Sequence, residues 1–120
     1  MTGPLTKVAE ARRNDLHREL DRIVGVLVEE YRPEKIILYG SLAGGEVHEW
    51  TDIDLVVIKN TKTPYFERLF ELSMLTRPRL AVDFFVYTPE EFEEAVADKR
   101  WFFVHEIIEK GKVLYERGRV

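Results

Sequence analysis

Two short apolar runs, close together in the chain, constrain the fold more than any other feature of this sequence. The first covers residues 36–39 and leads into Gly40 and Ser41, and the second covers residues 55–58 and follows Asp54. Continuous apolar runs of this length are typical of strands that are covered on both faces. The sequence therefore predicts two buried strands, at residues 36–39 and 52–58, joined by a short connector.

Asp52 and Asp54 lie two residues apart at the start of the second strand. Side chains alternate along a strand, so both carboxylates are expected on one face, about 6–7 Å apart, where they can share a metal ion. Gly40 lets a ligand approach the backbone, and Ser41 can open a short helix whose free N–H groups favour phosphate. A phosphate-binding turn beside two carboxylates indicates metal-assisted chemistry on a nucleotide.

Asp83 interrupts a third apolar run, at residues 80–87, which we expect to be the third strand. A buried carboxylate without a partner is costly, so Asp83 needs either a cation or an ion-pair partner. A salt bridge to a nearby arginine is the alternative interpretation. We favour a third metal ligand, because acidic side chains gathered from several strands mark functional sites.

The remaining pattern predicts helices packed on a small sheet. A helix is expected from about Ala9 to Pro33, after a loose tail at residues 1–8, and Gly25 within it indicates a close packing contact. Its apolar stripe is Leu16, Leu20, Ile23, Leu27 and Tyr31. A second helix is expected over residues 65–76, with its aromatic side chains in the core.

The last third of the chain begins with a strong helix-start signal. Thr88, Pro89 and Glu91 fit a capping box with proline at the first helical position, in a helix that ends near Ala97. A further helix is expected over residues 100–110, capped by Gly111, followed by an edge strand at residues 112–115. The predicted class is α/β (α+β), with a mixed sheet of three to four strands in a domain covering residues 9–120.

Composition limits the classes of function. The 120 residues include no cysteine, which excludes a disulfide framework and a zinc–thiolate site. No apolar run approaches the length of a membrane span, so a cytoplasmic protein is expected. The net charge of −4 disfavours direct binding to nucleic-acid backbones.

The spacing of these motifs resembles the polymerase-β-like nucleotidyltransferase superfamily. Gly40-Ser41, ten residues and then Asp52-Ile53-Asp54 match its GS-x10-DxD signature. The chain looks like the smallest branch of that superfamily, the minimal nucleotidyltransferase (MNT) domains. The resemblance covers most of the chain, and it implies the polymerase-β-like palm fold.

The resemblance also implies a mechanism. Asp52, Asp54 and Asp83 would be both catalytic residues and ligands of two Mg²⁺ or Mn²⁺ ions, and Gly40 and Ser41 would hold the triphosphate of ATP. The expected reaction transfers AMP to a hydroxyl on an acceptor. MNT domains are typically paired with small helical HEPN proteins in toxin–antitoxin modules, which implies a HEPN-type protein acceptor and an antitoxin role.

Two other functions remain open: a non-catalytic module that neutralises a HEPN partner by binding, and a small-molecule transferase of the antibiotic-modifying kind. Homo-oligomers are also left open. Related MNT domains often carry arginine where this chain has Gly44. A replacement cation would come from Lys59, Lys62, Arg77 or Arg79. In the connector, His48 is expected to face solvent, and Trp50 either stacks on a base or packs at the strand entrance.

Overall fold

A four-stranded mixed sheet forms the centre of the molecule. The computed structural model describes residues 4–48 and 50–118. The strands are β1 (Lys35–Tyr39), β2 (Ile53–Ile58), β3 (Val82–Tyr87) and β4 (Lys112–Glu116). They are ordered β3-β2-β1-β4, with β1 antiparallel to both of its neighbours and β2 parallel to β3. The predicted fold class is confirmed, including the edge strand near the C-terminus.

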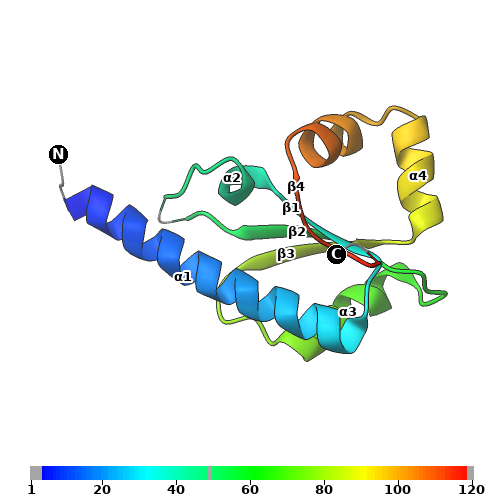
Figure 1. The fold of residues 1–120 in the computed structure, drawn as a ribbon, viewed down its shortest axis with the longest axis horizontal. Helices are drawn as coiled ribbons and strands as arrows, with labels where there is room; N and C mark the ends of the chain where they lie inside the picture. The colour runs from blue at the N-terminus through cyan, green and yellow to red at the C-terminus, as the bar shows by residue number, and fades with distance from the viewer. Residues whose placement is uncertain (1–3, 49, 119–120) are drawn as a thin grey trace.

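Helices cover both faces of this sheet (Figure 1). Helices α1 and α3 lie on one face, and α4 and the π-helix η2 lie on the other. Their bounds are α1 Pro4–Val26, η1 Leu27–Tyr31, α2 Gly40–Ala43, α3 Tyr65–Thr76, α4 Pro89–Ala97 and η2 Phe102–Glu109. None of the helices in the described ranges is long and apolar enough to cross a membrane.

The faces of the sheet follow strand alternation. Ile53, Leu55 and Val57 of β2 pack in the larger core, against α1 and α3. Val56 and Ile58 pack in the smaller core on the other face, with Ile107 of η2. Because Asp54 is in phase with Val56 and Ile58, its side chain belongs to the face that carries α4 and η2.

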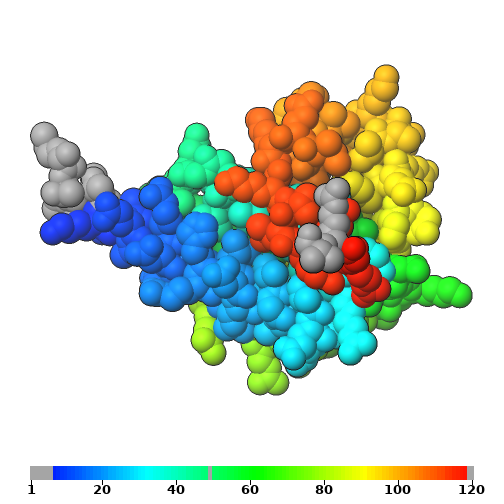
Figure 2. Space-filling view, in the orientation of Figure 1, coloured from blue at the N-terminus to red at the C-terminus, as the bar shows by residue number. Residues whose placement is uncertain are grey.

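The first helix is longer than its sequence pattern predicts. It begins at Pro4 instead of near Ala9, so residues 4–8 are helical, and the prediction of a loose tail there is wrong. Residues 1–3 of that tail lie outside the described residues. All five residues of the apolar stripe are buried, as predicted. The helical segment ends at Tyr31, where Arg32 takes a left-handed conformation before Pro33. The N-terminal part of α1 extends past the ends of the strands (Figure 1), and Figure 2 shows it projecting from the rest of the molecule.

Gly25 is exposed and does not mark a close contact, which corrects the prediction made from the pattern. A Cβ atom at Gly25 would have no neighbour within 4 Å, and the residue has no positive φ. We expect Gly25→Ala to raise the free energy of unfolding by about 1 kcal/mol, because alanine restricts the unfolded chain more than glycine does. Urea denaturation measures this change.

Gly45→Ala is the matched control for that substitution. Gly45 also has open space around it, but its φ is +80°. Alanine is strained in that conformation, so Gly45→Ala should destabilise the protein. A similar gain from both substitutions would contradict the conformational argument.

Helix α3 has the predicted bounds, but its aromatic side chains are not in the core. Phe66 and Phe70 are 82% and 67% exposed, whereas Leu72 is fully buried. Two polar residues, Arg68 and Thr76, are buried on the inner side of the helix. The prediction failed because the helix carries apolar residues on both sides, and periodicity alone did not show which side faces the sheet.

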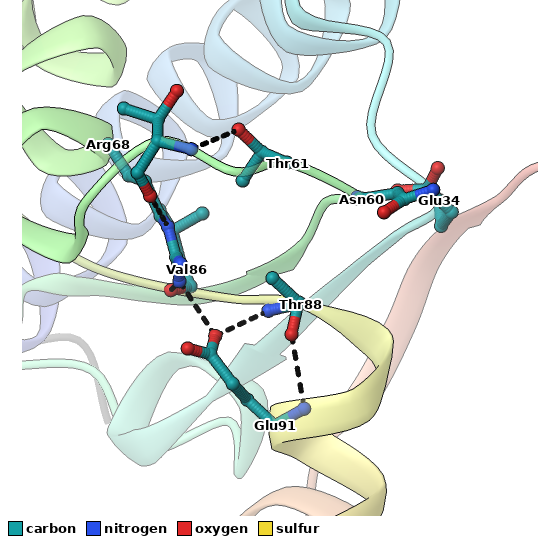
Figure 3. Close-up of polar contacts among 8 residues, drawn as sticks. Glu34, Asn60, Thr61, Arg68, Val86, Thr88 and Glu91 are labelled. Atoms are coloured by element: carbon teal, nitrogen blue, oxygen red, sulfur yellow. Dashed lines mark hydrogen bonds and ion pairs between the residues drawn. The ribbon is translucent and has the colours of Figure 1, made fainter.

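Arg68 joins three elements (Figure 3). Its guanidinium donates to the backbone oxygens of Thr63 at 2.7 Å and Val86 at 3.2 Å, and to the Glu91 carboxylate at 2.7 Å. Glu91 also accepts from the Thr88 N–H at 2.7 Å, and the Thr88 hydroxyl accepts from the Glu91 N–H at 3.1 Å. The predicted capping box of α4 is therefore confirmed, and Arg68 anchors it to α3.

Gly111 has a different role from the predicted helix cap. The cap of η2 is Lys110, and a Cβ atom at Gly111 would lie 2.3 Å from the Ile107 oxygen and 2.9 Å from Ile37 Cγ2. Glycine is required at this position by the close approach of the chain to η2 and β1, not by a left-handed turn.

Glu19 ties α1 to the segment that precedes β3. Its carboxylate is 5% exposed, accepts from the Arg22 guanidinium at 2.7 Å and also accepts from the backbone N–H groups of Arg79 and Leu80. The bond from Arg22, with the backbone bonds, lowers the pKa of Glu19 to about 2. The ionised form of Glu19 therefore stabilises the segment that precedes β3.

The lowered pKa of Glu19 predicts a loss of stability in acid. Its folded pKa lies below the unfolded value of 4.5, so its contribution is complete above about pH 4.5 and is lost as the pH falls towards 2. We expect Glu19→Gln to lower the free energy of unfolding by roughly 2–3 kcal/mol at pH 7 and by much less at pH 2.5. Urea titrations at both pH values test this, with Glu67→Gln, an exposed glutamate, as the control.

Candidate active site

The candidate site lies where the carboxyl end of β1 meets the amino ends of β2 and β3. Tyr39 pairs with Asp54 across the β1–β2 ladder, and Asp54 pairs with Asp83 across the β2–β3 ladder. Paired residues on adjacent strands project to the same face. The register therefore places these three side chains in a row across the sheet. It brings together Asp54 and Asp83, which are far apart in the sequence.

Gly40 forms the tight turn that follows β1. Its φ is +76°, and a Cβ atom there would lie 2.3 Å from Oδ2 of Asp54. Any side chain at this position would collide with the carboxylate. Glycine is therefore required at position 40 for two reasons: the backbone is left-handed there, and the chain approaches Asp54 closely.

Asp54 is the most perturbed carboxyl group of the site. Burial and the charges of Asp83 and Asp52 raise its pKa to about 6, with a further contribution from a hydrogen bond to Asp83. Crowding of like charges disfavours ionisation, and a cation between the groups would relieve it. Asp52 lies just before β2 instead of inside it, and Asp83 is exposed.

The donor set fits a hard divalent cation. Asp54 and Asp83 supply carboxylate oxygens, which Mg²⁺ and Mn²⁺ prefer, and Gly40 leaves open the space beside Asp54 Oδ2 that a Cβ atom would fill. Within residues 4–48 and 50–118, no three His, Cys, Asp or Glu side chains are already arranged as a metal cage. The described arrangement is thus a close pair, Asp54 and Asp83, with Asp52 alongside, and the metal-binding role of all three stays a prediction.

Ser41 lies in the short helix α2, which begins at Gly40 directly after the turn. The predicted helical turn in this connector is therefore confirmed. The Ser41 side chain is exposed, and its backbone oxygen accepts from the Glu46 N–H at 3.0 Å. Gly40 borders the Asp54 carboxylate from the β1 side and Ser41 follows it in the chain, and the binding of phosphate by both stays a prediction.

Arg12 is a residue that sequence reasoning missed. Its guanidinium donates to the Thr51 oxygen at 2.9 Å, directly before Asp52, and its Nε is buried without a hydrogen-bond partner among the described residues. Arg13 donates to the Gly45 oxygen at 3.4 Å. Both arginines come from the projecting part of α1 and hold the connector that carries the site. No sequence signal marked them, because arginines on a helix surface are normally solvated.

The cations expected to replace the missing arginine at Gly44 are mostly placed elsewhere. Lys59 follows the far end of β2, roughly 17 Å along the chain from Asp54, and donates to the Tyr31 oxygen at 2.7 Å. Lys62 lies beyond it, in the same loop. Arg77 and Arg79 precede β3 at the same end of the sheet as Asp83. The geometry therefore removes Lys59 and Lys62 as candidates.

The aromatic and histidine side chains of the connector are on the surface. His48 is exposed, as predicted, and its Nδ1 accepts from the Trp50 N–H at 3.2 Å. Trp50 is 76% exposed, so it does not pack at the strand entrance. Glu49, between them, lies outside the described residues. A base-stacking role is the remaining interpretation of Trp50.

A hollow of about 260 Å³ lies at the opposite end of β3 from Asp83. Tyr65, Tyr87 and Arg100 are among its lining residues. Tyr87 lies four positions after Asp83 along the strand, a distance of about 13 Å, so this hollow is not the space beside the carboxylate pair.

Comparison with known proteins shows which family and fold this chain shares. Residues 21–119 match the family described as Polymerase beta, Nucleotidyltransferase. A protein of Methanocaldococcus jannaschii named "Putative protein adenylyltransferase MJ0604" is 29% identical over 100 residues, which cover 82% of this chain and 96% of that protein. A crystal structure titled as a putative nucleotidyltransferase from Sulfolobus solfataricus superposes with a TM-score of 0.66, at 18% identity, over 92% of this chain and 88% of the other.

The family match contains every predicted site residue, from Gly40 to Asp83, and the structural similarity shows the same fold independently. The resemblance inferred from the GS and DxD motifs is thereby confirmed. This chain belongs to the polymerase-β nucleotidyltransferase family.

Proposed function

We propose that this protein is a metal-dependent nucleotidyltransferase that transfers AMP from ATP to a hydroxyl group of a protein. The observation that carries the proposal is the Asp54–Asp83 pair beside Gly40, because it combines crowded oxygen ligands with an open backbone turn. Family membership supports nucleotidyl transfer, and the name of the M. jannaschii relative supports a protein acceptor.

The residues of the site have distinct roles in this proposal. The turn at Gly40 and Ser41 holds the triphosphate, and Asp52, Asp54 and Asp83 hold divalent cations, Mg²⁺ or Mn²⁺. Bound cations supply charge neutralisation and lower the pKa of the attacking hydroxyl. The acceptor oxygen bonds to the α-phosphorus, and the bond from that phosphorus to the pyrophosphate oxygen breaks. In this proposal Asp83 receives the hydroxyl proton, and its exposure supports that role.

A small helical HEPN-type protein is the proposed acceptor, with this chain as its antitoxin. Within residues 4–48 and 50–118, the sheet and its covering helices make up most of the chain. A protein acceptor brings its own contact surface, on the order of 800 Å² per partner in a stable complex. The acceptor hydroxyl would belong to Tyr, Ser or Thr.

Co-expression with the product of the neighbouring gene, followed by intact-mass measurement of that product, tests the proposal. We expect a mass increase of one or more AMP groups with the wild type and none with Asp54→Asn or Asp83→Asn. Asp98→Asn, at the end of α4, is the matched control and should leave transfer unchanged. Neutralisation by all variants without added mass would establish binding alone. Transfer of labelled AMP from ATP to an aminoglycoside instead, with release of pyrophosphate, would establish a small-molecule transferase.

A further inference from the structure

The outer side of α3 presents an apolar surface to solvent. Phe66, Phe70 and Met74 are 82%, 67% and 52% exposed. Their spacing of four residues puts them on one side of the helix, and we call them the α3 stripe. A large aromatic side chain buries about 150–250 Å² when covered, so the stripe offers roughly 400 Å² of apolar surface. Patches of this size on a monomer often have a function.

The stripe has an acidic margin. Glu67 and Glu71 follow Phe66 and Phe70 directly in the helix, and both are exposed. Within the described ranges, neither has an ion-pair partner. The charge of Glu71 also reaches η1: burial of Tyr31 and the nearby Glu71 charge together raise the pKa of Tyr31 to about 12. The apolar stripe therefore lies beside uncompensated negative charge.

The acidic margin argues against an antiparallel pair of α3 helices from two copies of this chain. A two-fold axis perpendicular to the helices would form such a pair, with Phe70 facing its symmetry mate and Phe66 facing Met74. Such an axis keeps the same margin on the same side of both helices. Glu67 and Glu71 of one copy would then face Glu71 and Glu67 of the other, which is repulsive. A partner with a basic margin removes this conflict.

The stripe is also separate from the candidate active site. Helix α3 packs through Leu72 on the sheet face that carries α1, whereas Asp54 and Asp83 belong to the opposite face. Figure 1 shows the two faces with α3 below the sheet and α4 above it. A molecule bound to α3 would leave the carboxylate pair accessible.

We propose that the α3 stripe is a docking surface for an amphipathic helix of another protein, with apolar residues at helical spacing and Lys or Arg along one margin. The apolar residues of that helix cover Phe66, Phe70 and Met74, and its basic margin pairs with Glu67 and Glu71. Helices commonly dock on apolar surfaces in this way, through anchors on successive turns. The docking requires only the folded surface of α3 and does not depend on nucleotidyl transfer.

Two synthetic helical peptides test this surface. Both peptides carry the same stripe of leucines, and they differ only in the residues along its margins, which are lysine in one and glutamate in the other. Fluorescence anisotropy measures the binding of each peptide to the full-length protein. We expect saturable binding of the lysine peptide, at least tenfold tighter than the glutamate peptide. Phe70→Ser should weaken it at least tenfold. Trp101→Ser, which removes an aromatic side chain that is 62% exposed outside the stripe, should not change it.

Reversing the charge of the acidic margin tests the proposal without relying on the Phe70→Ser variant. Glu67→Lys with Glu71→Lys should reverse the preference, so that the glutamate peptide binds more tightly. Equal binding of both peptides, or binding that is unchanged by Phe70→Ser and by the charge exchange, would overturn the proposal. So would a concentration-dependent dimer of the free protein that Phe70→Ser dissociates, because the stripe would then be covered by a second copy.

Discussion

Gly40→Ala is expected to reduce nucleotidyl transfer at least about a hundredfold. The added Cβ atom would lie 2.3 Å from Oδ2 of Asp54, so either the turn or the carboxylate has to move. A displacement of about 1 Å at reacting groups is enough for a loss of this size. Transfer of label from ATP to the co-expressed acceptor, measured at saturating Mg²⁺, gives the rate.

Gly45→Ala is the control that separates the effect of the collision with Asp54 from the effect of backbone strain. Gly45 also has a positive φ, but a Cβ atom there meets nothing within 4 Å. Gly45→Ala should therefore destabilise the protein modestly and retain most of the transfer activity. If the two variants lost activity equally, the strain of the left-handed backbone would explain the loss, and the contact between Gly40 and Asp54 would not.

Asp54→Asn is expected to abolish transfer and, in the absence of metal, to stabilise the protein. Burial and the neighbouring carboxylates raise the pKa of Asp54 to about 6, so its charged form is unfavourable in the folded state. Asparagine has nearly the same shape and no charge. At pH 8 in EDTA we expect a gain of about 1–2 kcal/mol in the free energy of unfolding, discounted for the partial exposure of the site.

The pH dependence of this gain has a definite sign. The folded pKa of Asp54 lies above its unfolded value of 3.8, so wild-type stability falls as the pH rises from about 4 through 6. Asp54→Asn should remove that fall, and the gain should vanish near pH 4. Adding Mg²⁺ should stabilise the wild type at pH 8 and have little effect on the variant. A variant that is less stable than wild type in EDTA at pH 8 would contradict the crowding of charge.

The arrangement of the site could be predicted from the sequence in part. The GS and DxD motifs singled out Gly40, Ser41, Asp52 and Asp54, because they border apolar runs that predicted buried strands. The structure brings Gly40 beside Asp54. Asp83 was chosen because a carboxylate inside the third apolar run was expected to be buried. The structure shows its side chain exposed, so that reason is wrong, although Asp83 does pair with Asp54 across the ladder. The contact between Gly40 and Asp54 was not predictable, because it depends on a β1–β2 register that no local pattern specifies.

The roles of side chains that act through tertiary contacts could also not be predicted from the sequence. Arg12 of α1 holds the connector through the Thr51 oxygen, although an arginine on a helix surface is normally solvated. Arg68 is buried in α3, a position where the sequence pattern gives no reason to expect a charged residue. The outward direction of Phe66 and Phe70 had the same cause. A helix with apolar residues on two sides buries whichever side fits the sheet better, and that choice is made by the packed partners.

The order of the strands has a consequence for folding. Strands β1 and β2 are close in the chain and pair antiparallel, whereas β3 joins β2 only through the crossover that contains α3. Such a parallel pairing closes a longer loop and is expected to form later. Asp54 and Asp83 therefore meet only when β3 docks, and their repulsion opposes that step alone. A cation that binds both carboxylates would favour the docked strand, so the docking of β3 and the assembly of the site are one event.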